Sequence, residues 1–272
     1  MRTAVVGHVE YVEFASVRRV PRPGEIVTAH RDWTEPAGGG AVAAVQLARL
    51  AGECTLYTAL GDDEIAHRSR EGLERLGVRV VAATRAGQPT RRAFTFVDDT
   101  GERTITVIGA RLQPERDDPL PWDDLRDTDA VYFTAGGADA LRAARAGRTV
   151  VVTARVMDLI AEAKVPLDAI VGSGRDPSER YRAYDPAPRF VVTTEGAKGG
   201  HWIGADGRSG EWVAAPTPGP VADAYGCGDS FAAGLAYGLA DGRGIEGALE
   251  LAARCGAECL SGHGPYERQL TL

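Results

Sequence analysis

The sequence predicts an α/β fold built on a mostly parallel central sheet. From residue 129 onward, short valine-rich apolar runs alternate with stretches whose apolar residues recur at helical spacing. Such alternation is typical of strand–helix–strand units, in which successive strands lie parallel. Two more observations refine the prediction. Glycine-rich segments adjoin several expected strands, and residues 91–108 read as a hairpin that is expected to stand away from the core as a flap.

The N-terminal half supplies the first strands and two helices. TAVVGHV begins the sheet, and a less regular stretch with the breaker RVPRPGE at 18–25 follows. EPAGGG then leads into a helix whose apolar face is Ala43, Leu47, Leu50 and Ala51. Residues 55–60 are a strand, and GDDE at 61–64 is a turn into a helix that Gly77 ends. The hairpin joins RRAFTFV (91–97) to ERTITVI (102–108) through DDTG.

The C-terminal half repeats the strand–helix alternation. Strands are expected at 129–136, 148–154, 167–172 and 189–196, and helices at 138–147, 156–164 and 177–184. GHWIGADGRSGEWVAA (200–215) reads as a hairpin that turns near Asp206-Gly207. A helix of small residues follows DAYGCGDSF (223–231), and IEGALELAARCGAECL is the last helix.

Composition excludes several classes of function. The chain has 272 residues, 44% hydrophobic and 25% charged, which fits one large domain with a substantial core. A net charge of -7 and the lack of a basic stripe argue against a nucleic-acid partner. No apolar run approaches the roughly 18 residues of a membrane span. The start of the chain lacks the pattern of a signal peptide, so a cytoplasmic protein with four reduced cysteines is expected.

The stretch DAYGCGDSF carries the clearest chemical signal. It lies at a helix start, where free N–H groups can hold an anion, and a carboxylate stands beside them in Asp229. Phosphoryl transfer to an alcohol needs this combination of charge stabilisation and a base next to the acceptor. A tight turn with a helix-favouring acid is the competing interpretation. The sequence contains neither a Walker P-loop nor the GxGxxG fingerprint of nicotinamide-binding proteins.

DAYGCGDSF also resembles the C-terminal signature of the ribokinase (PfkB-type) carbohydrate kinases. Further segments resemble that family in the same order along nearly the whole chain: VVGHVE, EPAGGG with its helix, ALGDDE, GERT and VVTTEGAKGG. The resemblance implies a ribokinase-like three-layer α/β/α fold with a mostly parallel sheet and a small β lid. It implies one domain over 1–272, with lid strands from about 9–35 and 91–108.

The resemblance also implies an activity. The γ-phosphate of ATP would pass, with Mg²⁺, to a hydroxyl of a sugar or sugar-like small molecule. Asp229 would be the base, and the N–H groups of Gly226, Cys227 and Gly228 would form the anion hole. Asp223 matches a position that holds a monovalent cation such as K⁺ in many members, although a turn acid is an equally good interpretation.

Other segments match the nucleotide and acceptor sites of the family. The nucleotide segment corresponds to Thr194, Gly196, Lys198 and Gly199, and a solvated loop is the alternative for Lys198. The acceptor side corresponds to Gly38 and Gly39, which could instead be a plain helix-start loop, and to Glu10, which could be a surface acid.

The sequence departs from the family mainly where sugars are recognised. Val42 and Ala43 stand where an asparagine is common, and Val12, with Glu13 adjacent, where an aspartate is common. The Asn-x-x-Glu motif is missing from VGSGRDPSE (171–179). The acceptor is therefore less certain than the chemistry. A nucleoside kinase and a non-catalytic ligand-binding relative remain as alternatives, and the flap could pair with a second copy in a homodimer or fold over its own site.

Overall fold

A nine-stranded sheet forms the centre of the protein in the computed structural model, which describes residues 1–272. The strand order is β13-β12-β11-β10-β9-β8-β1-β4-β5. β12 runs antiparallel to both of its neighbours, β11 and β13, at one edge of the sheet, and all other neighbouring strands run parallel. The predicted α/β fold with a mostly parallel sheet is therefore confirmed. The strands are β1 (Thr3–Val6), β4 (Cys54–Gly61), β5 (Val78–Arg85), β8 (Ala130–Phe133), β9 (Thr149–Thr153), β10 (Ala169–Ser173), β11 (Phe190–Thr194), β12 (Gly200–Gly204) and β13 (Ser209–Trp212).

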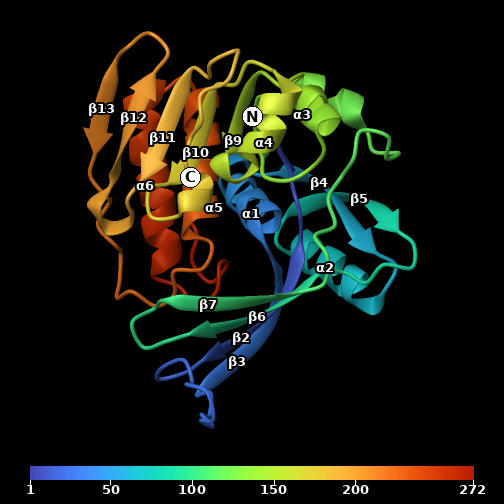
Figure 1. Ribbon diagram of the computed structural model, residues 1–272, viewed down its shortest axis with the longest axis vertical. Helices are drawn as coiled ribbons and strands as arrows, with labels where there is room; N and C mark the ends of the chain where they lie inside the picture. Colours follow the sequence, from blue (N-terminus) through green and yellow to red (C-terminus); the bar gives the residue numbers. More distant parts are fainter.

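Helices cover both faces of the sheet and give three layers (Figure 1). Successive residues of β1 point to opposite faces: Val5 belongs to one buried apolar cluster, whereas Ala4 and Val6 belong to another. The first cluster includes residues of α1 (Gly39–Ala51), α5 (Cys227–Ala240) and α6 (Gly244–Leu260), and the second includes α3 (Ala138–Ala144) and α4 (Met157–Ala163). α2 (Glu64–Arg75) packs beside β5. No helix is long and apolar enough to cross a membrane.

A second sheet of four strands projects from this body (Figure 1). Its order is β3-β2-β6-β7, formed by β2 (Glu10–Ser16), β3 (Arg31–Ala37), β6 (Arg92–Val97) and β7 (Arg103–Ile108). The predicted hairpin is the antiparallel pair of β6 and β7, and every residue of β7 is exposed. We call these four strands the small sheet.

Local signals in the sequence explain where several elements begin and end. Asp63 caps α2 by accepting a hydrogen bond of 2.9 Å from the Ala66 N–H, and Gly77 follows the helix with φ of +86°. The four cysteines are free, as expected, and three of them are buried.

The helix expected over 177–184 is wrong. Only Pro177–Glu179 forms a turn, of the 3₁₀ type, and Arg180 is already extended. The Glu179 carboxylate accepts a hydrogen bond of 2.8 Å from the Ser173 N–H at the end of β10 and also pairs with Arg155. These tertiary contacts hold the segment against the sheet and override its helical spacing. The other two expected helices are present but end sooner, at Ala144 and Ala163.

Candidate active site

The stretch 223–231 forms a tight entry into α5. Gly226 takes a left-handed φ of +79°, and a Cβ there would lie 2.8 Å from Pro265 Cβ and 2.9 Å from Val42 Cγ1. Only glycine fits this conformation and this close packing. The first N–H bond of the helix runs from Ser230 to the Gly226 carbonyl, at 2.9 Å. The preceding N–H groups therefore have no partner within the helix and can donate hydrogen bonds to an anion.

Open space adjoins this helix start at one residue. Nothing lies within 4 Å of the position that a Cβ on Gly228 would take, and Gly228 is exposed. Gly226, Cys227 and Gly228 thus form a rigid turn that opens onto solvent at its end. That these residues bind an anion stays a prediction.

Asp229 stands in the first turn of α5 and faces the other glycine segment. A Cβ on Gly39 would lie 2.9 Å from Asp229 Oδ1 and 3.0 Å from Thr134 Oγ1. The backbone of the Gly-Gly segment therefore approaches this carboxylate directly. Burial raises the pKa of Asp229 to about 6, an effect that the positive charge of Arg155 partly opposes. The carboxylate is ionised at neutral pH, but it is more basic than an ordinary aspartate.

The Gly-Gly segment also links the small sheet to the body. Gly38 has φ of +87°, its N–H donates to Tyr225 Oη at 3.2 Å, and its Cα packs against Glu10. β3 ends immediately before it and α1 begins at Gly39. Gly38, Gly39, Glu10 and Asp229, which are far apart in the sequence, are thus brought together at one place.

Glu10 is a buried acid, which contradicts its alternative interpretation as a surface residue. Its side chain is 9% exposed and lies 3.1 Å from Arg91 Nε and 3.6 Å from His8 Nε2. Burial by itself would raise the pKa of Glu10, but the neighbouring His8 and the charges of Arg91 and Arg111 lower it overall. Glu10 is therefore an ionised carboxylate at the junction of the two sheets.

Several residues near Asp229 were not found from the sequence. Arg155 follows β9 and bridges Glu179 Oε1 at 2.5 Å and Asp176 Oδ2 at 3.2 Å. Glu179 raises the pKa of Asp229, so the two carboxylates are neighbours. The sequence did contain a signal for these residues. Asp176-Pro-Ser-Glu179 has the spacing of the Asn-x-x-Glu motif, with aspartate in place of asparagine.

The predicted nucleotide segment forms a turn between β11 and β12. Gly196–Lys198 is a single 3₁₀ turn, and Gly199 has φ of +87° at a point where a Cβ would collide with the Trp212 carbonyl. Thr194 ends β11 and donates to the Gly172 carbonyl at 3.4 Å. Glycine therefore shapes this turn, and nucleotide binding by the segment stays a prediction.

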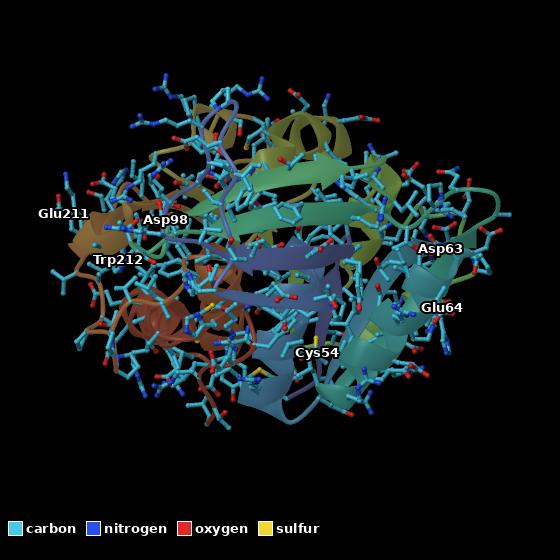
Figure 2. The ribbon with its side chains drawn as sticks, turned by 90° about the horizontal axis from the view of Figure 1, so that it is seen from below. Cys54, Asp63, Glu64, Asp98, Glu211 and Trp212 are labelled. Atoms are coloured by element: carbon cyan, nitrogen blue, oxygen red, sulfur yellow. The ribbon has the colours of Figure 1, made fainter.

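A cavity of about 530 Å³ opens beside this turn. Lys198 lines it, whereas Thr194, Gly196 and Gly199 do not. Its other walls come from β12, β13 and α6: Glu195, Gly200, His201, Glu211, Trp212, Val213, Glu246 and Glu250. Trp212 stacks on Phe231 of α5 at 5.6 Å between ring centroids, so the cavity adjoins the helix that carries Asp229. Seen from below, Glu211 and Trp212 lie at the opposite end of the small sheet from Asp63 and Glu64 (Figure 2).

Asp223 is completely buried behind the helix start. Oδ1 accepts a hydrogen bond of 2.8 Å from the Tyr225 N–H, and Oδ2 one of 2.9 Å from the Gly264 N–H. Burial raises the pKa of Asp223, and the carboxylate has no ion pair. A cation bound nearby would compensate this buried charge. No group of three or more acidic, histidine or cysteine side chains is placed to hold a metal ion.

Comparisons with known proteins agree on one family. The family model described as "pfkB family carbohydrate kinase" matches residues 2–159 and 167–271. An ATP-dependent ribose-1-phosphate kinase of Halopiger xanaduensis is 29% identical to the chain, over 94% of this chain and 91% of the relative.

Solved structures share the fold over almost the whole chain. Arabidopsis thaliana ribokinase, complexed with ribose and ATP, is 21% identical, with a TM-score of 0.75 over 98% of this chain and 95% of that one. A nucleoside kinase of Methanocaldococcus jannaschii from the ribokinase family is 17% identical, with a TM-score of 0.73 over 100% of this chain and 95% of that one. The predicted ribokinase-like fold is confirmed.

Proposed function

The chain belongs to the PfkB family of carbohydrate kinases, and on that premise we propose that it transfers the γ-phosphate of ATP to a hydroxyl of a sugar or sugar-like small molecule. The observation that carries the proposal is the meeting of Asp229, the open helix start at 226–228 and the Gly38-Gly39 backbone. In the proposed mechanism Asp229 is a base beside an anion cradle, and phosphoryl transfer depends mainly on such positioning and charge stabilisation.

Asp229 is the base in this mechanism. An acceptor hydroxyl that donates a hydrogen bond to its carboxylate is oriented toward the helix start. The carboxylate takes the hydroxyl proton as the new oxygen–phosphorus bond forms and the bond to the leaving ADP breaks. A pKa of about 6 keeps Asp229 ionised near neutrality and makes it a better proton acceptor than an aspartate in water.

The helix start at 226–228 stabilises the phosphoryl group in transit. Its free N–H groups point their dipoles at the negative charge that spreads over the phosphoryl oxygens. A cysteine is suitable at position 227, because in this mechanism only its backbone N–H interacts with the phosphoryl group. Arg103 of the small sheet acts electrostatically on Asp229 and would add a positive charge when a nucleotide is present.

ATP is the proposed donor, bound on the side of the 194–199 turn. The cavity beside Lys198 and Trp212 adjoins α5 and has room for part of a nucleotide. The ATP dependence of the Halopiger relative supports this assignment. Thr194, Gly196 and Gly199 then serve by shaping the turn, while Lys198 is the cation that can reach a phosphate.

The residues present fit a metal that arrives with the nucleotide. Mg²⁺ usually keeps several waters and binds one or two carboxylates together with substrate phosphates. Glu179 is near Asp229, and both Glu179 and Asp176 are paired with Arg155. They would hold the ion, which neutralises phosphate charge. Asp223, with its buried and unpaired charge, would hold K⁺ beside the anion hole.

A screen of acceptors tests the proposal. ADP release should be measured with Mg-ATP and a panel of sugars, sugar phosphates, sugar acids and nucleosides. We expect release that depends on an acceptor and on Mg²⁺. Turnover confined to nucleosides would support the nucleoside kinase alternative. Mg-ATP binding by calorimetry without any acceptor-dependent ADP release would instead support a non-catalytic relative.

A further inference from the structure

We propose that Gly101, in the turn between β6 and β7, is a positioning residue for the helix start at 226–228. Its carbonyl holds the loop that leads into this helix start, so the shape of the proposed anion hole depends on contact with the small sheet. The inference rests on the proposed function, because it assigns a support to the same site. It makes phosphoryl transfer conditional on the small sheet being docked against the body.

The burial of Gly101 is the first observation. Gly101 is buried, whereas the residues on both sides of it in the turn are exposed. Its carbonyl accepts a hydrogen bond of 2.9 Å from the Ala224 N–H. Ala224 lies two residues before Gly226 in the sequence. The turn of the hairpin therefore contacts the chain just ahead of the helix start.

The loop that Gly101 contacts has few other supports. After β13, residues 214–221 make no backbone hydrogen bond. The loop is then held from two sides: the Ala222 N–H donates to the Leu260 carbonyl at 2.9 Å, and the Ala224 N–H donates to Gly101. In Figure 1 this loop runs from β13 to the end of β7 that follows the turn. One anchor thus comes from the end of α6 and the other from the small sheet.

Tyr225 joins the same loop to the small sheet at a second place. The Gly38 N–H donates to its hydroxyl at 3.2 Å, and the Phe14 ring of β2 packs edge-on against its ring, with 5.0 Å between centroids. Tyr225 is buried and directly precedes Gly226. The chain that enters the helix start therefore contacts the small sheet at both Ala224 and Tyr225.

The turn itself is fixed by hydrogen bonds. Asp98 Oδ1 accepts hydrogen bonds from the Thr100 N–H at 2.9 Å, the Thr100 hydroxyl at 2.6 Å and the Glu102 N–H at 3.2 Å. Gly101 has φ of +78°, and a Cβ there would lie 2.9 Å from Val221 Cγ1. Both the backbone conformation and the close approach of the loop therefore favour glycine at this position.

Docking of the turn also brings a positive charge to the site. Arg103 begins β7 directly after the turn. Burial raises the pKa of Asp229, and the charge of Arg103 partly opposes this effect. Seen from below, Asp98 of the turn lies at the same end of the small sheet as Glu211 and Trp212, which line the cavity proposed for the nucleotide (Figure 2). Release of the turn would remove this charge as well as the support of the loop.

The test compares Gly101→Ala with Gly207→Ala, a matched control in the turn between β12 and β13. Gly207 has a similar φ of +82°, but a Cβ there would contact nothing. Because β12 runs antiparallel to β11, its turn lies at the edge of the central sheet opposite to the site. Hydrogen exchange without ligands should be faster in peptides that cover residues 222–226 for Gly101→Ala, and unchanged for Gly207→Ala.

Activity should separate the two variants as well. With Mg-ATP and the best acceptor from the screen, kcat of Gly101→Ala should fall about 10- to 100-fold, because a misplacement of about 1 Å can cost about 100-fold. Calorimetry should find little change in the Kd of Mg-ATP, and Gly207→Ala should keep the wild-type kcat. Adding Val221→Ala to Gly101→Ala removes the contact with the new methyl group, so kcat should recover.

Asp98→Ala provides a second route if Gly101→Ala does not fold. This substitution removes the hydrogen bonds that fix the turn and adds no atom, so kcat should fall. Asp98→Asn should restore kcat, because its amide oxygen can accept the same hydrogen bonds. Asp206→Ala is the control, since Asp206 accepts a hydrogen bond of 3.1 Å from the Arg208 N–H in the turn after β12.

Two outcomes decide between the proposals. An unchanged kcat, or unchanged exchange over residues 222–226, in the folded variants of Gly101 and Asp98 would overturn this inference and leave the kinase proposal standing. Absence of turnover by wild type with every acceptor would overturn the proposed function, and with it the role of this loop in phosphoryl transfer.

Discussion

At the scale of single residues, the substitution Asp229→Asn tests the base most narrowly. Asparagine keeps the size of the side chain but cannot take a proton. General-base assistance is typically worth about 10²–10⁴-fold, so kcat should fall by that factor while Mg-ATP binding, measured by calorimetry, changes little. If the variant turned over an accepted acceptor at nearly the wild-type rate, Asp229 would be only a helix-favouring acid.

The pH dependence of the reaction follows from the same residue. The ionised carboxylate is the active form, so kcat/KM should rise as pH increases through about 6, the raised pKa of Asp229, and level off above it. An aspartate with an ordinary pKa of ~3.9 would already be fully ionised in this range. The measurement is kcat/KM from pH 4.5 to 8.5 at saturating Mg-ATP. A flat profile between about 5 and 7 would contradict the assignment.

Two glycines of the same turn should respond differently to alanine. In Gly226→Ala the residue must keep a left-handed φ, and its methyl group would collide with Val42 and Pro265. The substitution should therefore lower the free energy of unfolding by more than about 1 kcal/mol.

In Gly228→Ala the added methyl group contacts no other atom, so urea unfolding should be unchanged. We expect kcat to fall at least tenfold, because the methyl group enters the space proposed for the phosphoryl group. If Gly228→Ala were fully active, Gly228 would not belong to the proposed anion hole.

The local structure of this turn could be predicted because its signal is local. Gly226, Gly228 and Asp229 lie within one short stretch, and the chemistry of a helix start explains each of them. Thr134, Glu179 and Arg111 come from three other segments, and each has an ordinary neighbourhood in the sequence. Only the fold shows that they lie near one site.

At the scale of elements, β3 approaches the loop after α6 through Glu35. Glu35 Oε1 accepts a hydrogen bond of 3.0 Å from Trp33 Nε1, and a Cβ on Gly264 would collide with this oxygen. Gly264 also donates to Asp223, so the small sheet reaches the loop that supports the buried acid. Burial, with a further contribution from the charge of Asp223, raises the pKa of Glu35 to about 7.

This contact predicts a pH-dependent stability. The folded protein holds a proton on Glu35 up to about pH 7, whereas the unfolded chain loses it near 4.5. The contribution of Glu35 to the free energy of unfolding is therefore lost as pH rises from about 4.5 to 7. Glu35→Gln should be more stable than wild type at pH 8 and lose this advantage at pH 5, as measured by urea unfolding. Glu13→Gln is the control, because Glu13 is exposed and has no polar partner. Identical pH profiles for wild type and Glu35→Gln would contradict the account.

The elements themselves were predictable where one pattern dominated. The β6–β7 hairpin and the strands of the parallel sheet carry clear β-branched runs, and α1 and α2 carry both an apolar face and an end signal. β5 was not identified, because VRVVAATR alternates only in part between apolar and polar residues. The prediction of a helix over 177–184 was wrong because Glu179 binds Ser173 and Arg155 instead. No local pattern in the sequence encodes these contacts.

At the scale of the whole molecule, the two sheets meet where the proposed chemistry takes place. Gly38 and Gly39 join the small sheet to α1, and Asp229 of α5 approaches the Gly39 backbone. The exposed β7, with Ile105, Val107 and Ile108 at its surface, leaves an open edge on the small sheet. Pairing of this edge in a homodimer stays a prediction. The overall fold was largely predictable, whereas the acceptor was not, because no local pattern in the sequence names it.

The most direct test of the central claim follows the γ-phosphate itself. Wild type and Asp229→Asn should be incubated with ATP labelled at the γ-position, Mg²⁺ and the acceptors that support ADP release, and the products separated and identified by mass spectrometry. The account predicts that wild type forms one phosphorylated acceptor for each ADP, with the label on the acceptor, and that Asp229→Asn forms it about 10²–10⁴-fold more slowly. Label found only in free phosphate, or equal rates for the two proteins, would contradict it.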